Sequence, residues 1–193
     1  MEKIKTIFHR DENNGGVITN VYEIPIEMLK ESIATEKIDG TNVRVTVRNQ
    51  KPVRLEKRRN PDKIHKYQGI IEPWYVDADE NDNADKWIYD ALKNTILVNI
   101  PDGEWSGEAV GTNIQGNPLN LDCNKIVFFT LGQCPELKDV PLGFEELKDW
   151  LPKQESKVGT GCKIEGIVWW RYGIPIGKIK TKDFRETRHE FKV

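Results

Sequence analysis

The chain has 193 residues, which is enough for one domain with a sizeable hydrophobic core and short for two. Charged residues make up 31% and hydrophobic residues 37%, a balance that excludes an intrinsically disordered chain. The formal net charge of −2 excludes a highly basic protein that coats nucleic acid. No apolar run approaches the roughly 18 residues that a membrane span needs.

Strand-like runs outnumber helical ones along the chain. Alternating and β-branched patterns predict strands at 17–23, 31–38, 42–48, 53–57, 106–111, 125–131, 164–171 and 174–181. Apolar residues at helical spacing predict helices at 83–94, with Asn83 as the N-cap, and at 143–151, which Pro152 ends. Strands with few helices and no regular β-α alternation favour an α+β fold with mainly antiparallel sheets.

The stretch ATEKIDGTNVRVTV places a lysine just before an Asp-Gly dipeptide, between two predicted strands. Asp39-Gly40 favours a type I′ turn, so the local prediction is a β-hairpin. One interpretation makes Lys37 an ordinary exposed strand residue. The other makes Lys37 a nucleophile that the turn presents at the edge of a pocket.

Charge is distributed unevenly along the chain. The stretch 44–60 is rich in Lys and Arg and contains one Glu, so it could follow a phosphate backbone. The acidic stretch 77–85 is predicted to be a solvated loop. Cys123, Cys134 and Cys162 are odd in number and far apart, and the first residues lack a secretory signal, which together predict a cytoplasmic protein with reduced thiols.

Two later segments carry candidate binding residues. The glycine-rich stretch 103–118 contains Glu108, although by itself it predicts only a loop with turn glycines. In KIVFFTLG the neighbouring Phe128 and Phe129 must point to opposite faces of a strand. One ring can therefore pack in the core while the other offers a flat surface.

Two further segments carry charges where strand formers dominate. In KIEGIVWW, Glu165 needs a cationic partner or a metal ion if it is buried. In GKIKTKDF, Lys178 and Lys180 share one face of a strand, and Lys182 joins them if the strand continues. Three cations on one face repel each other unless they face solvent or an anion.

In this order the segments resemble the motifs of the covalent nucleotidyltransferase superfamily of polynucleotide ligases and RNA-capping enzymes. EKIDGTN is similar to the first motif, K-x-D/H-G-x-N/R, and KRRN to the element after it. GEAVG resembles the third motif, VFFT the aromatic strand, EGIV the fourth motif and KIK the fifth. The resemblance implies two mainly antiparallel β-sheets with flanking helices, which form an ATP-grasp-like nucleotidyltransferase domain over residues 1–193.

Within the superfamily, Asn42 and GEAVGTNIQ resemble the bacteriophage-type RNA ligase 2 branch, because DNA ligases usually carry arginine at the first of these positions. The resemblance implies an ATP-dependent RNA ligase that acts in RNA repair. Lys37 would attack the α-phosphorus of ATP, expel pyrophosphate and become lysyl-AMP. The AMP would pass to an RNA 5′-phosphate, and a 3′-hydroxyl would then displace it.

The resemblance also assigns the catalytic cations and the metal. Lys178 and Lys180 would contact the α-phosphate, and Glu165 would bind Mg²⁺ or Mn²⁺. Positive neighbours disfavour the ammonium form of a lysine, so these groups would help to activate Lys37 and would neutralise the phosphates.

The remaining assignments concern the nucleoside. By the resemblance, Glu108 accepts a hydrogen bond from the ribose, and Phe129, or else Phe128, stacks on adenine. Arg59, or else Arg58, reaches the ribose or a phosphate. The last three residues assigned to the nucleotide pocket are Glu36 and Ile38, which flank the lysine, and Asn42, which could instead serve the RNA 3′ end.

Only thirteen residues follow Lys180, so we expect no C-terminal OB or helical domain of the kind that other polynucleotide ligases carry. The N-terminal segment, the basic stretch 44–60 or a partner protein would then help to grip RNA. Three alternatives stay open: a minimal DNA ligase, a guanylyltransferase that caps RNA, and a non-catalytic nucleic-acid-binding domain.

Overall fold

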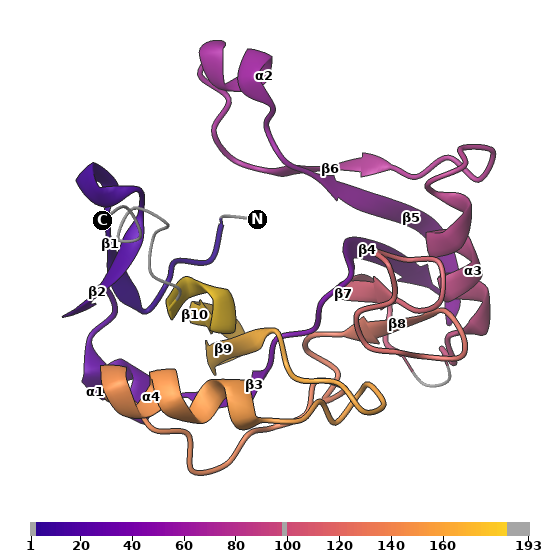
Figure 1. Cartoon of the computed structure of the whole chain (residues 1–193). Helices are drawn as coiled ribbons and strands as arrows, with labels where there is room; N and C mark the ends of the chain where they lie inside the picture. The colour runs from indigo at the N-terminus through magenta and orange to yellow at the C-terminus, as the bar shows by residue number, and fades with distance from the viewer. Residues whose placement is uncertain (1–2, 98–99, 185–193) are drawn as a thin grey trace. The chain divides into compact units, whose positions relative to one another are not determined.

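The computed structural model describes residues 3–97 and 100–184, and this part of the chain divides into two compact units (Figure 1). Unit 1 comprises Ile38–Cys134 and Val158–Cys162, together with Lys3. Among the described residues, unit 2 comprises Ile4–Lys37, Pro135–Lys157 and Lys163–Phe184. Each unit is therefore assembled from separated segments. Most of the thirteen residues after Lys180, namely 185–193, lie outside the described part.

Unit 1 is built on a five-stranded antiparallel sheet in the order β6-β5-β4-β7-β8. Its strands are β4 (Thr41–Arg48), β5 (Lys51–Arg59), β6 (Trp74–Asp77), β7 (Gly103–Val110) and β8 (Lys125–Phe128). On one face, the alternating Val43, Val45 and Val47 are fully buried and belong to the same core cluster as Ile88 and Ala91 of helix α3 (Lys86–Asn94). The other face carries the polar groups described below. A short helix, α2 (Lys63–Tyr67), lies in the connection between β5 and β6.

Unit 2 contains a three-stranded antiparallel sheet in the order β10-β9-β3 and a two-stranded sheet, β1-β2. Its core centres on Trp169, Phe8, Leu147 and Ile179, which are at most 1% exposed. The strands are β1 (Phe8–Asp11), β2 (Val17–Tyr22), β3 (Ile33–Glu36), β9 (Gly166–Arg171) and β10 (Ile174–Lys180). The α-helices are α1 (Ile26–Lys30) and α4 (Phe144–Trp150), and the 3₁₀ helices are η1 (Glu12–Asn14), η2 (Leu151–Lys153) and η3 (Thr181–Phe184).

The predicted α+β class with antiparallel sheets is confirmed, and each predicted strand and helix is present with slightly different ends. The two-stranded sheet adds to the two sheets that we expected. Strands β1 and β6 and helices α1 and α2 were not predicted. The Asn83 cap is wrong, because the carboxylate that accepts backbone N–H groups before α3 is Asp82, which bonds Ala84 and Asp85.

The predicted β-hairpin around Asp39-Gly40 is wrong. Strand β3 pairs with β9, whereas β4 pairs with β5 and β7 in a different sheet. Gly40 is not among the residues with positive φ, so it forms no type I′ turn. Glycine is needed there for space, since a Cβ would lie 2.2 Å from the carbonyl oxygen of Ala109. Lys37 thus lies in a segment that connects two sheets.

The acidic stretch 77–85 is only partly the solvated loop that we expected. Asp85 is 3% exposed, and its two carboxylate oxygens accept from Lys57 Nζ at 2.5 and 2.6 Å. Asp85 also accepts from the backbone N–H of Asp79. No helix in the described residues has the length and apolar character that crossing a bilayer requires.

Candidate active site

The register of the unit 2 sheet brings Lys37 next to Glu165. Lys37 directly follows β3, and its backbone N–H donates to the carbonyl of Gly166 at 2.9 Å. Because β3 runs antiparallel to β9 with Glu36 opposite Ile167, Lys37 lies opposite Gly166 and close to the preceding residue, Glu165. A Cβ at Gly166 would lie 2.1 Å from the carbonyl oxygen of Ile179, so glycine permits the close approach of β9 and β10.

The side chains of this cluster form a lysine–carboxylate–lysine bridge. Lys37 Nζ donates to Glu165 Oε2 at 2.5 Å, and Lys180 Nζ donates to Glu165 Oε1. The three side chains are 14–20% exposed, so solvent screens them only in part. Burial raises the pKa of Glu165, but the charges and hydrogen bonds of the two lysines outweigh burial and hold this pKa below its usual value.

The bridge revises our expectation about how Lys37 is activated. Lys180 is one of the cations that we expected near Lys37, but the direct ion-pair partner of both lysines is the carboxylate of Glu165. A carboxylate favours the ammonium form, which is not a nucleophile. In this structure Glu165 therefore anchors the side chain of Lys37.

Lys178 and Lys180 are the two predicted site lysines on strand β10. Lys178 and Lys180 alternate with the fully buried Ile179, so both lie on the opposite face of β10 from the core. Lys178 also continues the sheet through its backbone, which bonds Lys5 and Ile7. The strand ends at Lys180 and Lys182 is exposed on η3, so the condition under which Lys182 would join this face is not met.

Glu36, the residue before Lys37, is a buried carboxylate with its own partners. It is 1% exposed and accepts from Ser156 Oγ at 2.5 Å and from the backbone N–H of Lys157 at 2.9 Å. Its own N–H donates to the carbonyl of Pro135. No pattern in the sequence singled out Ser156 or Lys157 as partners of Glu36. Their contacts anchor the strand end from which Lys37 extends.

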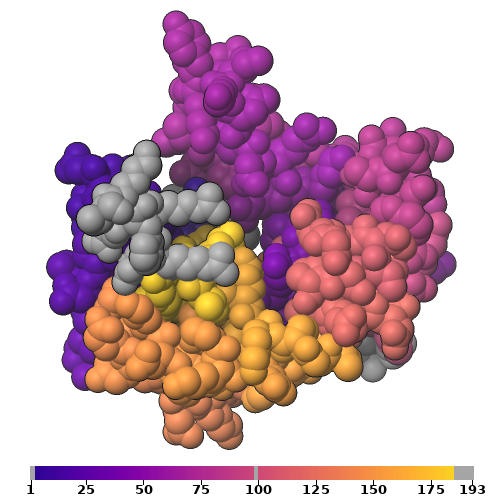
Figure 2. All heavy atoms as spheres, viewed as in Figure 1, coloured from indigo at the N-terminus to yellow at the C-terminus, as the bar shows by residue number. Residues whose placement is uncertain are grey.

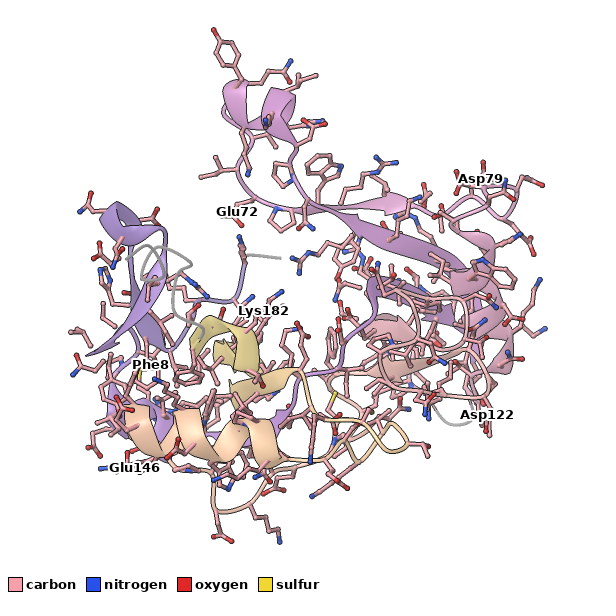
Figure 3. The ribbon with its side chains drawn as sticks, in the orientation of Figure 1. Phe8, Glu72, Asp79, Asp122, Glu146 and Lys182 are labelled. Carbon is pink, nitrogen blue, oxygen red and sulfur yellow. The ribbon has the colours of Figure 1, made fainter. Side chains whose placement is uncertain are left out.

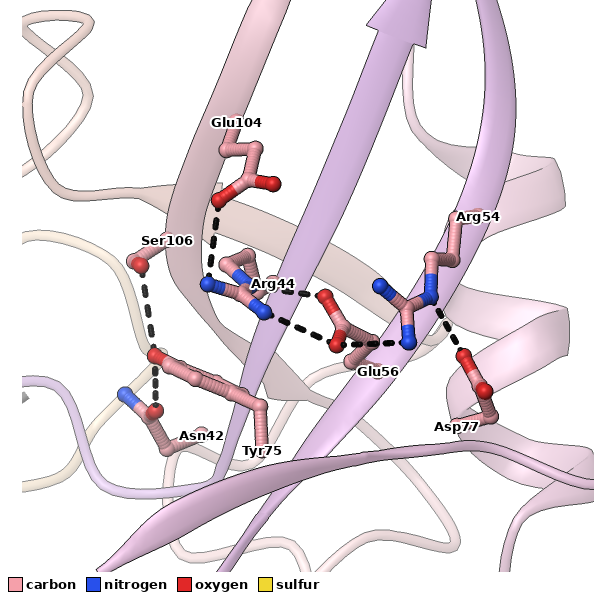
Figure 4. Close-up of polar contacts among 8 residues, drawn as sticks. All are labelled: Asn42, Arg44, Arg54, Glu56, Tyr75, Asp77, Glu104 and Ser106. Carbon is pink, nitrogen blue, oxygen red and sulfur yellow. Dashed lines mark hydrogen bonds and ion pairs between the residues drawn. The ribbon is translucent and has the colours of Figure 1, made fainter.

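Unit 1 carries a chain of hydrogen bonds across three strands (Figure 4). Asn42 on β4 donates through Nδ2 to Glu108 on β7 at 3.3 Å, and its Oδ1 accepts from the Tyr75 hydroxyl on β6 at 2.8 Å. Because that hydroxyl has given its only proton to Asn42, Ser106 Oγ must donate to it across 3.2 Å. The chain thus connects two predicted site residues to Tyr75 and Ser106, which the sequence did not single out.

Tyr75 is held firmly on this face of the sheet. The Arg44 guanidinium lies 4.5 Å from the centre of its ring, within the range of a cation–π contact. Burial raises the pKa of Tyr75, and the opposing effects of Ser106 and the nearby arginines are smaller. The phenol therefore stays protonated and can donate to Asn42 at neutral pH.

The same face continues into a network of ion pairs that revises our view of the basic stretch 44–60 (Figure 4). Glu56 is 1% exposed and accepts from Arg44 at 2.7 and 2.8 Å. It also pairs with Arg54, which bonds Asp77. Arg44 pairs further with Glu104. Three of the seven basic side chains of this stretch, Arg44, Arg54 and Lys57, therefore have carboxylate partners inside unit 1, and their charge is not free for phosphates.

The structure separates the two phenylalanines of VFFT. Phe128 is fully buried in the core beside α3, so it cannot offer its face to a ligand. Phe129 packs against the cluster that includes Ile38 and Val127, and Val127 pairs with Glu108. By strand alternation, Phe129 is the ring on the face of Glu108. Ile38 is 3% exposed within that cluster.

Strand alternation also bears on the choice between Arg58 and Arg59. Lys57 pairs with the core residue Val43, so Lys57 and Arg59 point to the α3 face of the sheet. Arg58 pairs with Tyr75 and points to the face that carries Asn42. The register therefore favours Arg58, the alternative, over Arg59 for contact with anything bound near Asn42.

We expect Tyr75→Phe to lower the free energy of unfolding by about 1 kcal/mol, because it leaves Asn42 Oδ1 without its donor. In a double-mutant cycle with Asn42→Ala, the two changes should couple, since both break the same bond. Chemical denaturation measures both quantities. Tyr172→Phe, which alters a mostly exposed side chain, is the control and should leave the free energy of unfolding unchanged. Additive effects of Tyr75→Phe and Asn42→Ala would contradict the hydrogen-bond chain.

The described residues contain no group of three or more His, Cys, Asp or Glu side chains that could hold a metal ion. Glu165 is a single carboxylate between two ammonium groups. This donor set suits Mg²⁺ or Mn²⁺ only if the ion keeps most of its waters and shares oxygens with a bound phosphate, which is how Mg²⁺ commonly binds. Glu165 fits that limited role.

No protein-family model matches this sequence, and no curated protein matches it either. The fold is similar to that of solved RNA ligases. The structure is similar to that of the Naegleria gruberi RNA ligase in an alanine mutant of a lysine solved with ATP and Mn, with a TM-score of 0.51, 14% identity and 95% of this chain covered. An alanine mutant of an arginine in that ligase, also with ATP and Mn, gives a TM-score of 0.50, 14% identity and 98% coverage.

The chain spans 55–64% of the length of the Naegleria ligase chains that it matches. At such low identity the likeness establishes the fold and leaves the roles of individual residues open. The resemblance to the bacteriophage RNA ligase 2 branch stays a prediction, as does the single-domain organisation.

Proposed function

We propose that this chain is an ATP-dependent RNA ligase that works through a lysyl-AMP intermediate at Lys37. The observation that carries the proposal is the cluster of three motif residues in unit 2, in which the side chains of Lys37 and Lys180 both bond the carboxylate of Glu165. The fold of an RNA ligase supports the same function. We extend the proposal to the RNA ligase 2-like branch, to RNA repair and to a cytoplasmic location.

In the first step, the neutral Lys37 amine attacks the α-phosphorus of ATP. A P–N bond forms, the bond to the bridging oxygen breaks, and pyrophosphate leaves with that electron pair. The amine must first lose a proton, and Glu165 must first release its hold on the ammonium. Lys178 and Lys180 would stabilise the charge that develops on the phosphate oxygens.

Glu165 is the residue that would hold a divalent cation. When bound, Mg²⁺ or Mn²⁺ would neutralise phosphate charge during the transfer. A carboxylate that turns toward such a cation no longer pairs with Lys37, so the same residue can anchor the lysine at rest and free it for reaction. This dual role of Glu165 links the resting ion pair to the chemistry.

The later steps use the RNA. The RNA 5′-phosphate attacks the phosphorus of lysyl-AMP, which returns the amine to Lys37 and leaves AMP joined to the RNA end. The 3′-hydroxyl of the other RNA end then attacks the 5′-phosphorus, the phosphodiester forms, and AMP leaves. A partner protein could assist in holding the two ends.

The nucleoside contacts that the sequence predicts are part of this proposal. Glu108 would accept from the ribose and Phe129 would stack on adenine, with Asn42 and Arg58 or Arg59 beside them. Glu36 and Ile38 remain assigned to the nucleotide through their backbone. Tyr75 would act through Asn42, because its hydroxyl fixes the direction of that amide.

A panel of labelled nucleotides and nicked substrates tests this function against its alternatives. The wild-type protein with Mg²⁺ should take label from α-labelled ATP and not from GTP, because a capping guanylyltransferase would do the opposite. It should seal nicks flanked by RNA and not those flanked by DNA. A protein that binds RNA but never retains label from either nucleotide would instead be a non-catalytic binding domain.

A further inference from the structure

The connection between β5 and β6 forms an arm that stands away from the sheet of unit 1. We define the arm as residues 60–73; it contains α2 and lies in magenta at the far end of the β5-β6 ribbon (Figures 1 and 2). Its chain returns past Glu72 toward β6 (Figure 3). Nothing in the chemistry described above uses the arm.

The arm has a defined local structure. The Asp62 carboxylate caps α2 by accepting from the backbone N–H of His65 at 2.9 Å. The His65 ring lies 4.9 Å from the ring of Trp74, measured between centroids, at the start of β6. The backbone N–H of Ile70 bonds the carbonyl of His65, which closes the turn after the helix. These contacts give the side chains on α2 a fixed base.

The tip of the arm exposes apolar groups together with cations. Tyr67 is 95% exposed, and Ile64, one helical turn away on the same side, is 69% exposed. Lys63 and Lys66 are exposed beside them, and neither has a carboxylate within ion-pair distance among the described residues. The paired cations of β4 and β5 differ in this respect, because Arg44, Arg54 and Lys57 are neutralised.

An exposed aromatic ring on the same short helix as two unpaired lysines matches the way proteins hold single-stranded nucleic acid. Bases stack on aromatic rings whatever their sequence, and lysines contact the phosphates beside them. An isolated apolar surface would fit many protein partners, but unpaired positive charge on a chain of net charge −2 favours a polyanion. We propose that the arm is a docking site for a single-stranded segment of RNA, with Tyr67 as the stacking platform.

This inference rests on the proposed function, since it locates the RNA that a ligase must hold. It names a surface in unit 1 that is separate from the residues assigned to the nucleotide. Because the arm residues take no part in nucleotide transfer, RNA binding and labelling by ATP can be measured independently on the same variants.

The experiment measures binding of a fluorescein-labelled single-stranded RNA by fluorescence anisotropy, without ATP. Tyr67→Ala should weaken binding about tenfold or more, and Tyr67→Phe should bind like the wild type because it keeps the ring. The double variant Lys63→Ala/Lys66→Ala should flatten the slope of log affinity against log salt by about 1.4, or about 0.7 per lysine. Each arm variant should still take label from ATP at the wild-type rate.

Matched controls come from unit 2. Tyr172 is 89% exposed and Lys138 is exposed, so Tyr172→Ala and Lys138→Ala remove the same kinds of side chain elsewhere on the surface. Neither control should change RNA affinity. The wild type should also bind the single strand more tightly than a fully paired duplex of the same sequence, since stacking needs an unpaired base.

Three results would overturn the docking site. Tyr67→Ala could bind RNA within twofold of wild type, or the wild type could fail to bind the single strand. Alternatively, the protein could sediment as a dimer that Ile64→Asp dissociates, which would make the arm a contact between copies. A wild-type protein that takes no label from ATP but still binds RNA through the arm would contradict the proposed function. It would not contradict the docking site.

Discussion

Lys37→Ala is expected to abolish covalent labelling of the protein by α-labelled ATP. The change removes the nitrogen that would carry the AMP, so no residual activity should remain after denaturing electrophoresis. Lys37→Arg should be equally inactive, because a guanidinium stays protonated and offers no free electron pair. The wild-type label should be lost in acid, as a phosphoramidate is.

Lys30→Ala is the control for this prediction. Lys30 lies in the same unit, is paired with Glu27 on α1 and takes no part in the site. Its variant should label like the wild type. Retention of label by Lys37→Ala, in a protein whose thermal unfolding is cooperative, would show that another residue is the nucleophile.

Glu165→Gln is expected to have the second largest effect, on both stability and activity. It removes the negative charge shared by Lys37 and Lys180 and replaces one of the two acceptor oxygens by an amide group that only donates, so one ammonium group loses its partner. We expect a loss of about 2–4 kcal/mol in the free energy of unfolding of the metal-free protein at pH 7. Labelling should fall sharply and require more Mg²⁺, because the proposed metal ligand has lost its charge.

The effect of Glu165 on stability should depend on pH in a definite direction. Its pKa is lowered in the folded state, so the unfolded chain binds the proton more tightly. The stabilisation is then fully present above the unfolded carboxyl pKa of about 4.3 and is lost as pH falls through the lower folded value. Urea denaturation of wild type and Glu165→Gln should differ most at neutral pH and converge in acid.

An exposed ion pair provides the comparison for Glu165. Glu155 is 77% exposed and pairs with Lys163 at 3.3 Å, so Glu155→Gln should cost less than about 1 kcal/mol. If the two glutamine variants lowered the free energy of unfolding equally, the bridge between Lys37 and Lys180 would stabilise the protein no more than an exposed ion pair does. Normal labelling of Glu165→Ala at limiting Mg²⁺ would remove Glu165 from the metal site.

The sequence was most informative where strand patterns and chemistry coincide. The alternating valines of β4 predicted a half-buried strand. The same alternation identified the residues that share its polar face. The rule that Phe128 and Phe129 must point in opposite directions also held, although only the core packing of Phe128 showed which ring remained for a ligand. Lys178 and Lys180 lie on one face of β10 as expected.

Other features depend on pairing between segments far apart in the chain. The hairpin at Asp39-Gly40 failed because β3 finds its partner in β9, about 130 residues later, and local turn propensity carries no information about that choice. The carboxylate partner of Lys37 was missed for the same reason. Tyr75 on β6 donates to Asn42 on β4, and β5 lies between these two strands. No pattern near either residue in the sequence therefore predicts the contact.

Local sequence patterns also did not predict the division of the chain into two units. Unit 1 and unit 2 each consist of separated segments, and one boundary falls between Lys37 and Ile38, inside a single motif. No linker composition marks such a boundary, because the chain passes from one unit to the other within ordinary structured segments.

The most direct test is to find where the nucleotide is attached. Wild-type protein incubated with ATP and Mg²⁺ is digested under neutral conditions, and each peptide is weighed by mass spectrometry. We predict that one peptide gains the mass of AMP and that fragmentation places it on the side chain of Lys37. AMP on Lys178 or Lys180, or on no peptide at all, would contradict the assignment of Lys37 as the nucleophile.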